Sequence, residues 1–408
     1  MIVNLYLEYL LLLRAGGFFL RHLVLSVVLV LLTGCASMGD LGISNFVDLL
    51  SNKDEVEVNE EEIAALEALP QIPILWQLGL NKSEIAVFSP IYENGAVYVA
   101  DAKGQLVRLD PATGKENWQV ETEHKLSGGV GAGHGMILIG TFKGEVLAFD
   151  EMGNERWKAR VTSEVLSPPQ VDSGVVIARS GDGRIFGLDA ADGKRKWVYQ
   201  GPTPALTMRN FTSVLIYRGA VFAGLAGGKL IAMNLVNGNV GWEATVSQPR
   251  GVTELERMTD IAGLPVIDDQ QVCAVAYNGR IACFEIADGN QIWARDASSN
   301  VGLTMDNNNV YVSEDRGAVV AYDKRSGAMM WKQAKLGSRK LSAPLVVRGA
   351  LLAVGDAEGN VSLLRRHDGS LVARAATDGS AILSRPEYIP DGFVVQTSKG
   401  GIYAFAAQ

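Results

Sequence analysis

The chain of 408 residues has little of the chemistry on which most enzymes depend. It contains four histidines and three cysteines, and His124, His134 and His367 lie far apart in the sequence. No HExxH pair is present, and the cysteines are not clustered at the spacing that metal sites use. The sequence therefore indicates no catalytic residues, no metal site and no cofactor, and we expect a protein that is not an enzyme.

A strongly basic region is also missing. The net charge is −8, and nine acidic residues with one lysine account for the same value between Cys35 and Pro70. Residues 1–34 carry +1, so residues 71–408 sum to about −1. Because nucleic-acid binding needs clustered Lys and Arg, this near-neutral segment excludes nucleic acid as a partner.

Only the N-terminus has a long apolar run. Leu23 to Leu32 follows Arg14 and Arg21 and ends in the sequence Leu32-Thr33-Gly34-Cys35. That order is typical of a secretory signal with a lipobox, in which the cysteine is lipidated and becomes the mature N-terminus. We expect a lipoprotein signal peptide over residues 1–34 and lipidation at Cys35; the alternative is a transmembrane anchor with a chance cysteine.

The acidic segment of residues 35–70 is predicted to be a solvated tether between the lipid and the folded domain. A short helix is expected near its end, from Glu60 to Leu69. The segment would serve as a plain spacer, or alternatively dock on a basic partner.

What the chain has in abundance is one repeated pattern, in which a glycine, several apolar residues, a second turn and a tryptophan follow one another. The first copy runs from Gly104 to Trp118, and seven further copies begin at Gly144, Gly183, Gly228, Gly279, Gly317, Gly359 and Gly400. The seventh copy has Ala373 where tryptophan is expected, and the eighth stops with the chain. Trp76 supplies the missing half of a repeat at the other end.

The repeat length predicts a β-propeller. Consecutive tryptophans are 42, 39, 40, 45, 51 and 38 residues apart, which fits blades of four short strands. Alternating apolar residues on either side of a glycine turn indicate hairpins within each copy. We predict an all-β, eight-bladed propeller over residues 71–408, closed by an N-terminal strand at residues 74–78 that becomes the outermost strand of the last blade.

Three recurrent residue types have structural roles in this interpretation. The tryptophans are expected to pack between adjacent blades, the alternative being that they stack on a ligand. Prolines near Ser89, Ser167, Ser342 and Ser384 suit the start of the innermost strands, since proline cannot donate to a strand ladder. Aspartates at the end of the third strand (Asp110, Asp150, Asp189 and Asp323) are expected to cap turns.

Cys273 and Cys283 flank the hairpin turn at Asn278-Gly279. A four-residue turn like that of the first copy would point the two thiols to opposite faces of the sheet, whereas a three-residue turn would set them opposite each other. Either a disulfide or two free thiols is consistent with the sequence. We favour two buried free thiols, because other copies have apolar or small residues at both positions.

Two connections between blades are longer than the repeat requires. They are residues 200–213 and 247–263, which follow Trp197 and Trp242 and emerge on the same face of the propeller. Loops that depart from a repeat on one face are common binding sites. We predict a partner-binding surface, with covering of the blade junction as the alternative. Its residues are Leu206, Met208 and Arg209 from the first connection and Glu254, Arg257 and Asp260 from the second.

The repeats resemble the tryptophan-docking repeats of quinoprotein dehydrogenases. The combination of lipobox, acidic tether, eight blades and no catalytic set resembles the BamB family, the lipoproteins of the outer-membrane β-barrel assembly machinery. This resemblance covers essentially the whole chain. Its discriminating segments are the run of Leu206, Met208 and Arg209 and the run from Thr253 to Asp260. The family has a further acidic residue where this chain has Ala262, and usually leucine at the position of Met208.

The resemblance implies a scaffold anchored by lipid to the periplasmic leaflet of the outer membrane. It implies that the two segments contact the periplasmic POTRA domains of BamA within a multi-protein complex, and that unfolded outer-membrane β-barrel proteins are further partners. The second hypothesis is a periplasmic quinone-dependent dehydrogenase. Neither the adjacent cysteine pair nor the calcium-binding carboxylates of that family are visible in the sequence.

Overall fold

The structure is a computed structural model that describes residues 60–407 except 84, 85, 203, 210, 212 and 338. The expected signal peptide, the lipidation site Cys35 and most of the expected tether lie outside the described residues. The described residues belong to one compact unit. No helix within the described residues is long and apolar enough to cross a membrane.

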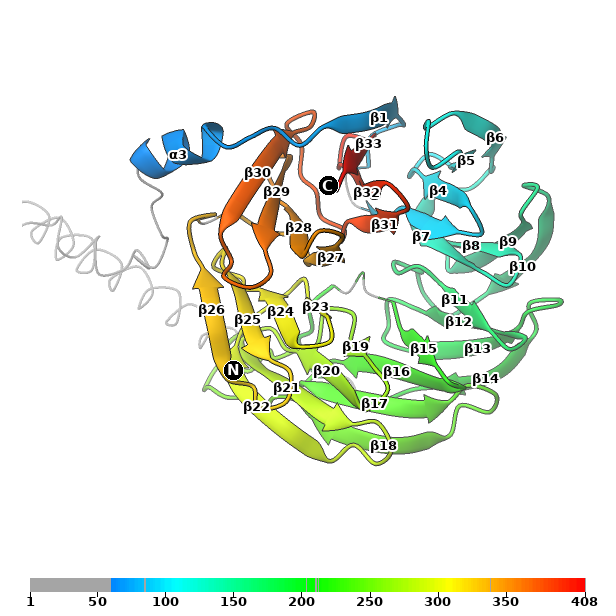
Figure 1. Ribbon diagram of the computed structural model, residues 1–408. Helices are drawn as coiled ribbons and strands as arrows, with labels where there is room; N and C mark the ends of the chain where they lie inside the picture. Colours follow the sequence, from blue (N-terminus) through cyan, green and yellow to red (C-terminus); the bar gives the residue numbers. More distant parts are fainter. Residues whose placement is uncertain are drawn as a thin grey trace, which may run out of the picture. The chain divides into compact units, whose positions relative to one another are not determined.

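Eight four-stranded antiparallel sheets are arranged around a central axis as the blades of a propeller, which confirms the predicted fold (Figure 1). Blades 1 to 4 contain β3 (Ile91–Glu93), β4 (Ala96–Ala100), β5 (Gln105–Leu109) and β6 (Glu116–Glu121); β7 (Leu126–Gly133), β8 (Met136–Thr141), β9 (Glu145–Asp150) and β10 (Glu155–Arg160); β11 (Gln170–Asp172), β12 (Val175–Arg179), β13 (Ile185–Asp189) and β14 (Arg195–Tyr199); and β15 (Leu215–Tyr217), β16 (Ala220–Leu225), β17 (Lys229–Asn234) and β18 (Val240–Thr245).

Blades 5 to 8 follow in the same order around the ring. They contain β19 (Val266–Ile267), β20 (Gln271–Val275), β21 (Gly279–Glu285) and β22 (Gln291–Ala297); β23 (Leu303–Met305), β24 (Asn309–Ser313), β25 (Val319–Asp323) and β26 (Met329–Gln333); β27 (Leu345–Val347), β28 (Leu351–Gly355), β29 (Asn360–Arg365) and β30 (Leu371–Ala376); and β31 (Glu387–Ile389), β32 (Gly392–Gln396), β33 (Gly401–Ala406) and β1 (Ile74–Gly79). The short β2 (Val87–Phe88) adds a parallel strand to the inner edge of β7.

The ring closes as predicted, because β1 pairs with β33 from the opposite end of the chain. Trp76 lies opposite Ala404 in this pairing. Just before β1, Gln71 forms a parallel bridge to Arg374 of blade 7. The N-terminal segment therefore joins blades 7 and 8 and covers an edge that would otherwise have unpaired N–H and C=O groups.

The first strand of each blade lies innermost, and the fourth lies at the rim (Figure 1). Pro90, Pro168, Pro344 and Pro386 each precede an innermost strand by one or two residues, which confirms the prediction for these prolines. Proline suits this place because one edge of an innermost strand faces the central channel and needs no donor there.

The tryptophans lock neighbouring blades together. Every indole N–H donates a hydrogen bond of 2.8 to 3.0 Å to a backbone carbonyl in the turn between the third and fourth strands of the next blade. Trp76, for example, donates to Pro111 and lies over Gly114, whose φ is +68° and where an added Cβ would be 2.5 Å from the indole Cδ2. A glycine is needed there because the ring occupies the space of a side chain. The packing role of the tryptophans is thus confirmed.

The one missing tryptophan has a structural reason. The equivalent position in blade 7 is Ala373, and its neighbour is blade 8. There the third strand, β33, pairs with β1, which lies more than 300 residues earlier in the sequence, so no tight turn joins the third and fourth strands. A tryptophan at position 373 would therefore have neither the carbonyl nor the glycine on which the other seven indoles dock.

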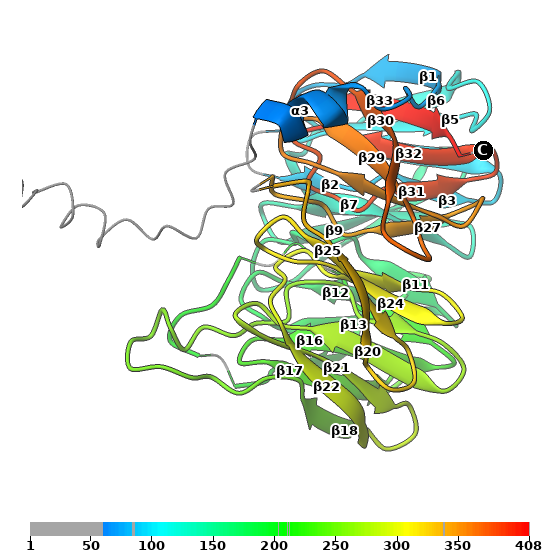
Figure 2. The ribbon, with the colours of Figure 1, turned by 60° about the vertical axis from the view of Figure 1, so that its left-hand side comes forward.

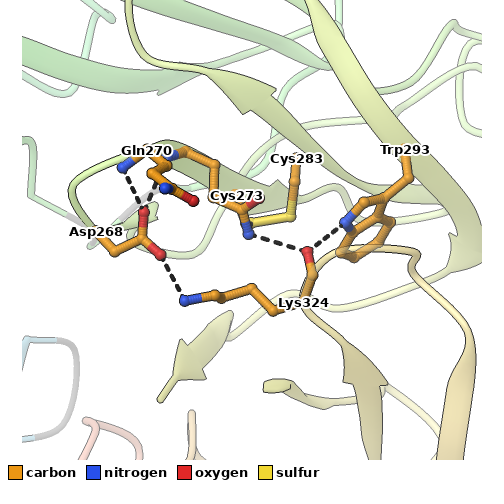
Figure 3. Close-up of a disulfide and its surroundings, with 7 residues drawn as sticks. Asp268, Gln270, Cys273, Cys283, Trp293 and Lys324 are labelled. Atoms are coloured by element: carbon orange, nitrogen blue, oxygen red, sulfur yellow. Dashed lines mark hydrogen bonds and ion pairs between the residues drawn. A yellow bond between two sulfur atoms is a disulfide. The ribbon is translucent and has the colours of Figure 1, made fainter. Parts of the chain in front are cut away.

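The preference for two free thiols is wrong, because Cys273 and Cys283 form a disulfide (Figure 3). The last pair of this hairpin is Val275 with Ile281, and Cys273 lies directly opposite Cys283, with their Cα atoms 4.1 Å apart. The hairpin of blade 1 has the same register, with Ala100 opposite Leu106, so a turn like that of the first copy does not separate the two thiols. Both cysteines are fully buried beside Trp293 in a cluster that joins blades 5 and 6.

A further set of contacts between blades 5 and 6 lies near the disulfide. The carbonyl of Lys324 accepts hydrogen bonds from the Trp293 indole and from the side-chain amide of Gln271, at 2.8 and 3.1 Å. The ammonium of the same lysine lies 2.7 Å from Asp268, as Figure 3 shows. Blade 5 therefore holds one turn of blade 6 through backbone and side-chain contacts together.

The end of the expected tether forms the predicted helix, α3 (Glu60–Glu67). Leu66 is 3% exposed and packs with Leu336, Leu341 and Val354, which belong to blade 7 and the connection that leads to it. The last turn of the acidic segment is thus part of the propeller core, although the segment had been expected to be solvated up to residue 70.

Candidate functional site

The two long connections lie together on one side of the ring. The first joins β14 to β15 and the second joins β18 to β19, and both project from the propeller in Figure 2, where they are green. As the sequence predicted, they belong to neighbouring blades and come from the same face. The repeat gives no reason for their length, because the other blades are joined without such extensions.

Asp260 of the second connection is hydrogen-bonded to the backbone of the first. Its side chain is buried, with 5% of the residue exposed. One carboxylate oxygen accepts a hydrogen bond from the backbone N–H of Met208 at 2.6 Å, and the other accepts one from Gly227 at 2.9 Å. The position of Met208 therefore depends on a residue of the second connection.

A half-buried arginine lies next to the same contact. Arg179 of β12 donates to the carbonyl of Gly224 at 2.8 Å. Burial lowers the pKa of this guanidinium to about 10, while the charge of Asp260 acts to raise it. Arg179, Met208 and Asp260 line a small cavity of about 110 Å³. The attraction between the guanidinium and the carboxylate stabilises the base of the projecting surface.

Above this base, the first connection presents apolar and basic groups to solvent. Leu206 is 42% exposed, and Met208 is half-buried. Arg209 is exposed, and its guanidinium lies 5.6 Å from the ring centre of Phe211, within the range of a cation–π contact. An apolar residue beside a stacked arginine is a common composition of an energetically important protein contact.

The second connection is ordered by a capped turn. The carboxylate of Glu256 accepts hydrogen bonds from the backbone N–H groups of Val252 and Thr253, and the Thr253 hydroxyl accepts one from the N–H of Glu256. This reciprocal arrangement is a capping box. The amide of Asn278 in blade 5 also donates to the carbonyl of Glu256, at 2.9 Å.

That turn holds two aliphatic side chains in solvent that our sequence analysis missed. Val252 is 96% exposed and Leu255 is 66% exposed. The spacing of Thr253 and Glu256 in the sequence would have revealed the ordered turn. Because a fixed apolar group loses little freedom when it is covered, these two residues extend the candidate surface.

Of the six predicted residues, the structure brings Met208 and Asp260 into direct contact, and the other four lie on the two connections. Leu206, Arg209, Glu254 and Arg257 are exposed, and Met208 is half-buried. Asp260 lies underneath, with both carboxylate oxygens engaged by the backbone. Because Asp260 is buried and bonded to backbone N–H groups, its role is to position the exposed residues.

The predicted aspartate caps have the expected geometry. Asp110 accepts hydrogen bonds from the N–H groups of Ala112 and Thr113 and from the Thr113 hydroxyl. These bonds, chiefly that from the hydroxyl, lower the pKa of its carboxyl group. Asp150, Asp189 and Asp323 accept equivalent backbone bonds at their own turns. Among the residues that the structure describes, no three His, Cys, Asp or Glu side chains gather as metal ligands would.

Comparison with known proteins relates the chain to one family. The sequence profile described as outer membrane protein assembly factor BamB matches residues 60–125, 102–333 and 316–408. A protein of that name from Nitrosomonas eutropha is 62% identical over 396 residues, which are 97% of each chain. Another, from Bordetella pertussis, is 42% identical over 328 residues, or 80% of this chain and 85% of that one.

Solved structures agree on the fold. The crystal structure of BamB from Moraxella catarrhalis superposes with a TM-score of 0.76 at 27% identity, covering 82% of this chain and all of that one. A quinohemoprotein alcohol dehydrogenase from Comamonas testosteroni superposes with a TM-score of 0.68 at 13% identity, covering 84% of this chain and 77% of the enzyme. At that identity the second likeness shows a shared propeller and nothing more.

Proposed function

Because this chain belongs to the BamB family of outer membrane protein assembly factors, we propose that it acts in outer-membrane protein assembly as a scaffold without catalytic activity. Its partners in this proposal are the periplasmic POTRA domains of a BamA-type protein within a multi-protein complex. By holding that complex together, the propeller would assist the insertion of β-barrel proteins.

The observation that carries the proposal is the hydrogen bond between Asp260 and the backbone of Met208. Through it, two segments that the repeat does not require form one ordered surface. Leu206 supplies the apolar group of that surface and Arg209 supplies five donors in a fixed plane. A partner that covers them gains apolar burial and, with an acidic residue opposite Arg209, a charge-assisted hydrogen bond.

We further propose that the chain is anchored to the outer membrane by lipid at Cys35, with the propeller in the periplasm. The lipobox supports this anchor, and the acidic segment after it supplies a hydrophilic spacer. The disulfide between Cys273 and Cys283 fits an oxidising compartment such as the periplasm. Unfolded β-barrel proteins are proposed as a second, transient class of partner.

The test is binding of two variants to the isolated POTRA domains. Arg209→Ala should weaken binding by about 2 kcal/mol, which is typical of an arginine at the centre of an interface. Leu206→Glu should weaken it further, because an unpaired charge would face an apolar surface. Both should melt like the parent, since substitutions of exposed residues usually change stability by about 0.5 kcal/mol or less.

Arg195→Ala is a matched control, because Arg195 is an exposed arginine of the neighbouring strand β14, away from both connections. It should bind the POTRA domains as the parent does. Parent-like binding by both test variants would remove this surface from the interface. Weak binding together with lowered melting temperatures would instead support the alternative that the connection only covers the blade junction.

The quinone-dependent dehydrogenase remains the competing hypothesis, and no observation on this chain favours it. The cysteines in the folded part are ten residues apart in sequence and bridge two strands of one blade, unlike the adjacent pair of that family. Adding the quinone with calcium and recording absorbance of bound cofactor would decide between the two. Stoichiometric binding with substrate oxidation would overturn the scaffold proposal.

A further inference from the structure

The mouth of the central channel is a cavity of about 450 Å³ on the face that carries the long connections. Strands of blades 1, 2, 3, 6 and 8 and the connections that lead into blades 4, 5 and 7 form its wall, and most of the lining side chains are apolar. Ile91, Val130, Phe211, Leu303 and Leu383 are among them. A cavity of this size, apolar with a few polar groups, has the character of a site for a small molecule or a chain end.

Two of the three charged groups of the cavity, Arg385 and Glu387, come from blade 8 and the segment that leads into it. Ser384 and Arg385 line it from the segment that leads into β31, and Glu387 lines it from the first position of β31, which is the innermost strand of blade 8 (Figure 1). Ser384 is 6% exposed, and its hydroxyl has no hydrogen-bond partner within the part of the chain that the structure describes. A buried hydroxyl without a partner costs free energy, which a bound oxygen atom would recover.

The balance of charge in the cavity is positive. Its lining contains two guanidinium groups, Arg209 at the rim and Arg385, and one carboxylate, Glu387. Among the described residues, the one hydrogen bond to Glu387 is a long bond of 3.4 Å from the N–H of Tyr92. Burial raises the pKa of Glu387, and the nearby charge of Arg385 opposes that rise.

We propose that the channel mouth binds a carboxylate that carries an apolar body. The carboxylate would lie against Arg385 and the Ser384 hydroxyl, and the apolar part would cover Phe211, Leu303 and Leu383. Two sources of such a group are a free fatty acid and the C-terminus of a peptide that ends in an apolar residue. The carboxylate contacts do not use the proposed partner surface, because Arg209 is not assigned to the carboxylate; Phe211 is the one assigned contact that lies on the first connection.

The choice of an anion over a cation follows from these groups. Arg385 and Ser384 offer donors to a carboxylate, whereas an ammonium group would find Glu387 as its only charged acceptor in the lining and would meet two like charges. An uncharged apolar ligand would leave the Ser384 hydroxyl without a partner. A carboxylate on an apolar body therefore pairs with Arg385, gives the Ser384 hydroxyl a partner and covers the apolar wall.

The proposal is tested by calorimetric titration of the full chain in lipid nanodiscs, with empty nanodiscs as the blank. The probes are octanoate and N-acetyl-phenylalanine, and the matched controls are octanol, octylamine and N-acetyl-phenylalanine amide. Binding of either carboxylate but not of its control is expected, and the tighter of the two identifies the source. Tighter binding of octylamine than of octanoate, or no binding of either carboxylate, would overturn the site.

Two variants of opposite sign complete the test. Arg385→Gln should weaken carboxylate binding by about tenfold, the effect of losing one charge-assisted hydrogen bond. Glu387→Gln should strengthen it, because a competing negative charge is removed, and a gain of affinity cannot arise from misfolding. Loss of affinity in Glu387→Gln would contradict the proposal.

The same variants separate this inference from the partner surface. Arg385→Gln should bind POTRA domains as the parent does, while Leu206→Glu should lose them and still bind the carboxylate. If the partner surface is wrong, Leu206→Glu keeps its POTRA binding. If the carboxylate site is wrong, Arg385→Gln keeps the carboxylate affinity of the parent.

Discussion

The buried carboxylate of Asp260 lies 2.6 Å from the backbone nitrogen of Met208, although 52 residues separate them in the sequence. This contact links the conformation of one long connection to that of the other. A partner that recognises Leu206 and Arg209 therefore depends on a residue that it need not touch.

Removing that carboxylate should damage both stability and binding. Asp260→Ala leaves two backbone N–H groups without their acceptor and Arg179 without the opposing charge, so we expect a loss of about 2–4 kcal/mol in the free energy of unfolding. Urea denaturation and POTRA binding measure the two effects. Glu254→Gln, at an exposed residue of the same connection, is the control for the denaturation measurement alone, and its free energy of unfolding should be within about 0.5 kcal/mol of the parent. A stable Asp260→Ala variant that binds normally would contradict the positioning role.

A pair of glycine substitutions isolates the contribution of tryptophan docking. Gly95 and Gly114 both have positive φ, of +76° and +68°, but only Gly114 lies under an indole ring. Gly95→Ala should cost about 1 kcal/mol, the strain of alanine in that conformation. Gly114→Ala should cost about 2 kcal/mol more, because the new methyl group displaces Trp76. Equal melting temperatures of the two variants would show that the indole contact contributes little.

The disulfide between Cys273 and Cys283 can be tested by chemical modification of the two cysteines. Mass spectrometry after alkylation in guanidinium chloride should find Cys273 and Cys283 unmodified without reductant and modified after reduction. Replacing both by alanine should destabilise the propeller by about 2–3 kcal/mol, the value for a closed loop of this length. Alkylation of both thiols without any reductant would show that the disulfide does not form.

The anchor is tested on Cys35, which lies outside the described residues. Cys35→Ser should leave a folded propeller that no longer fractionates with the outer membrane, since several acyl chains give the stable attachment that a protein surface lacks. Circular dichroism serves as the check on folding. Membrane association of this variant in high salt would contradict the lipobox interpretation.

The sequence by itself determined the propeller, because its information is local and repeated. A glycine turn and a tryptophan about every 40 residues are enough to fix the number of blades, the direction of the strands and the place where the ring closes. The two connections that exceed the repeat could be found for the same reason, as departures from a period.

Only the tertiary structure decided two kinds of contact. One kind joins residues far apart in the sequence, and the other depends on the exact register of two paired strands. The pairing of Cys273 with Cys283 depends on which residues of the two strands lie opposite each other, and the sequence did not resolve this. Asp260 looks like a surface acid in the sequence, but the fold of two blades buries it under Met208. The absence of tryptophan at Ala373 and the polar groups of the channel mouth have meaning only once the ring is closed, because each depends on which blade becomes its neighbour.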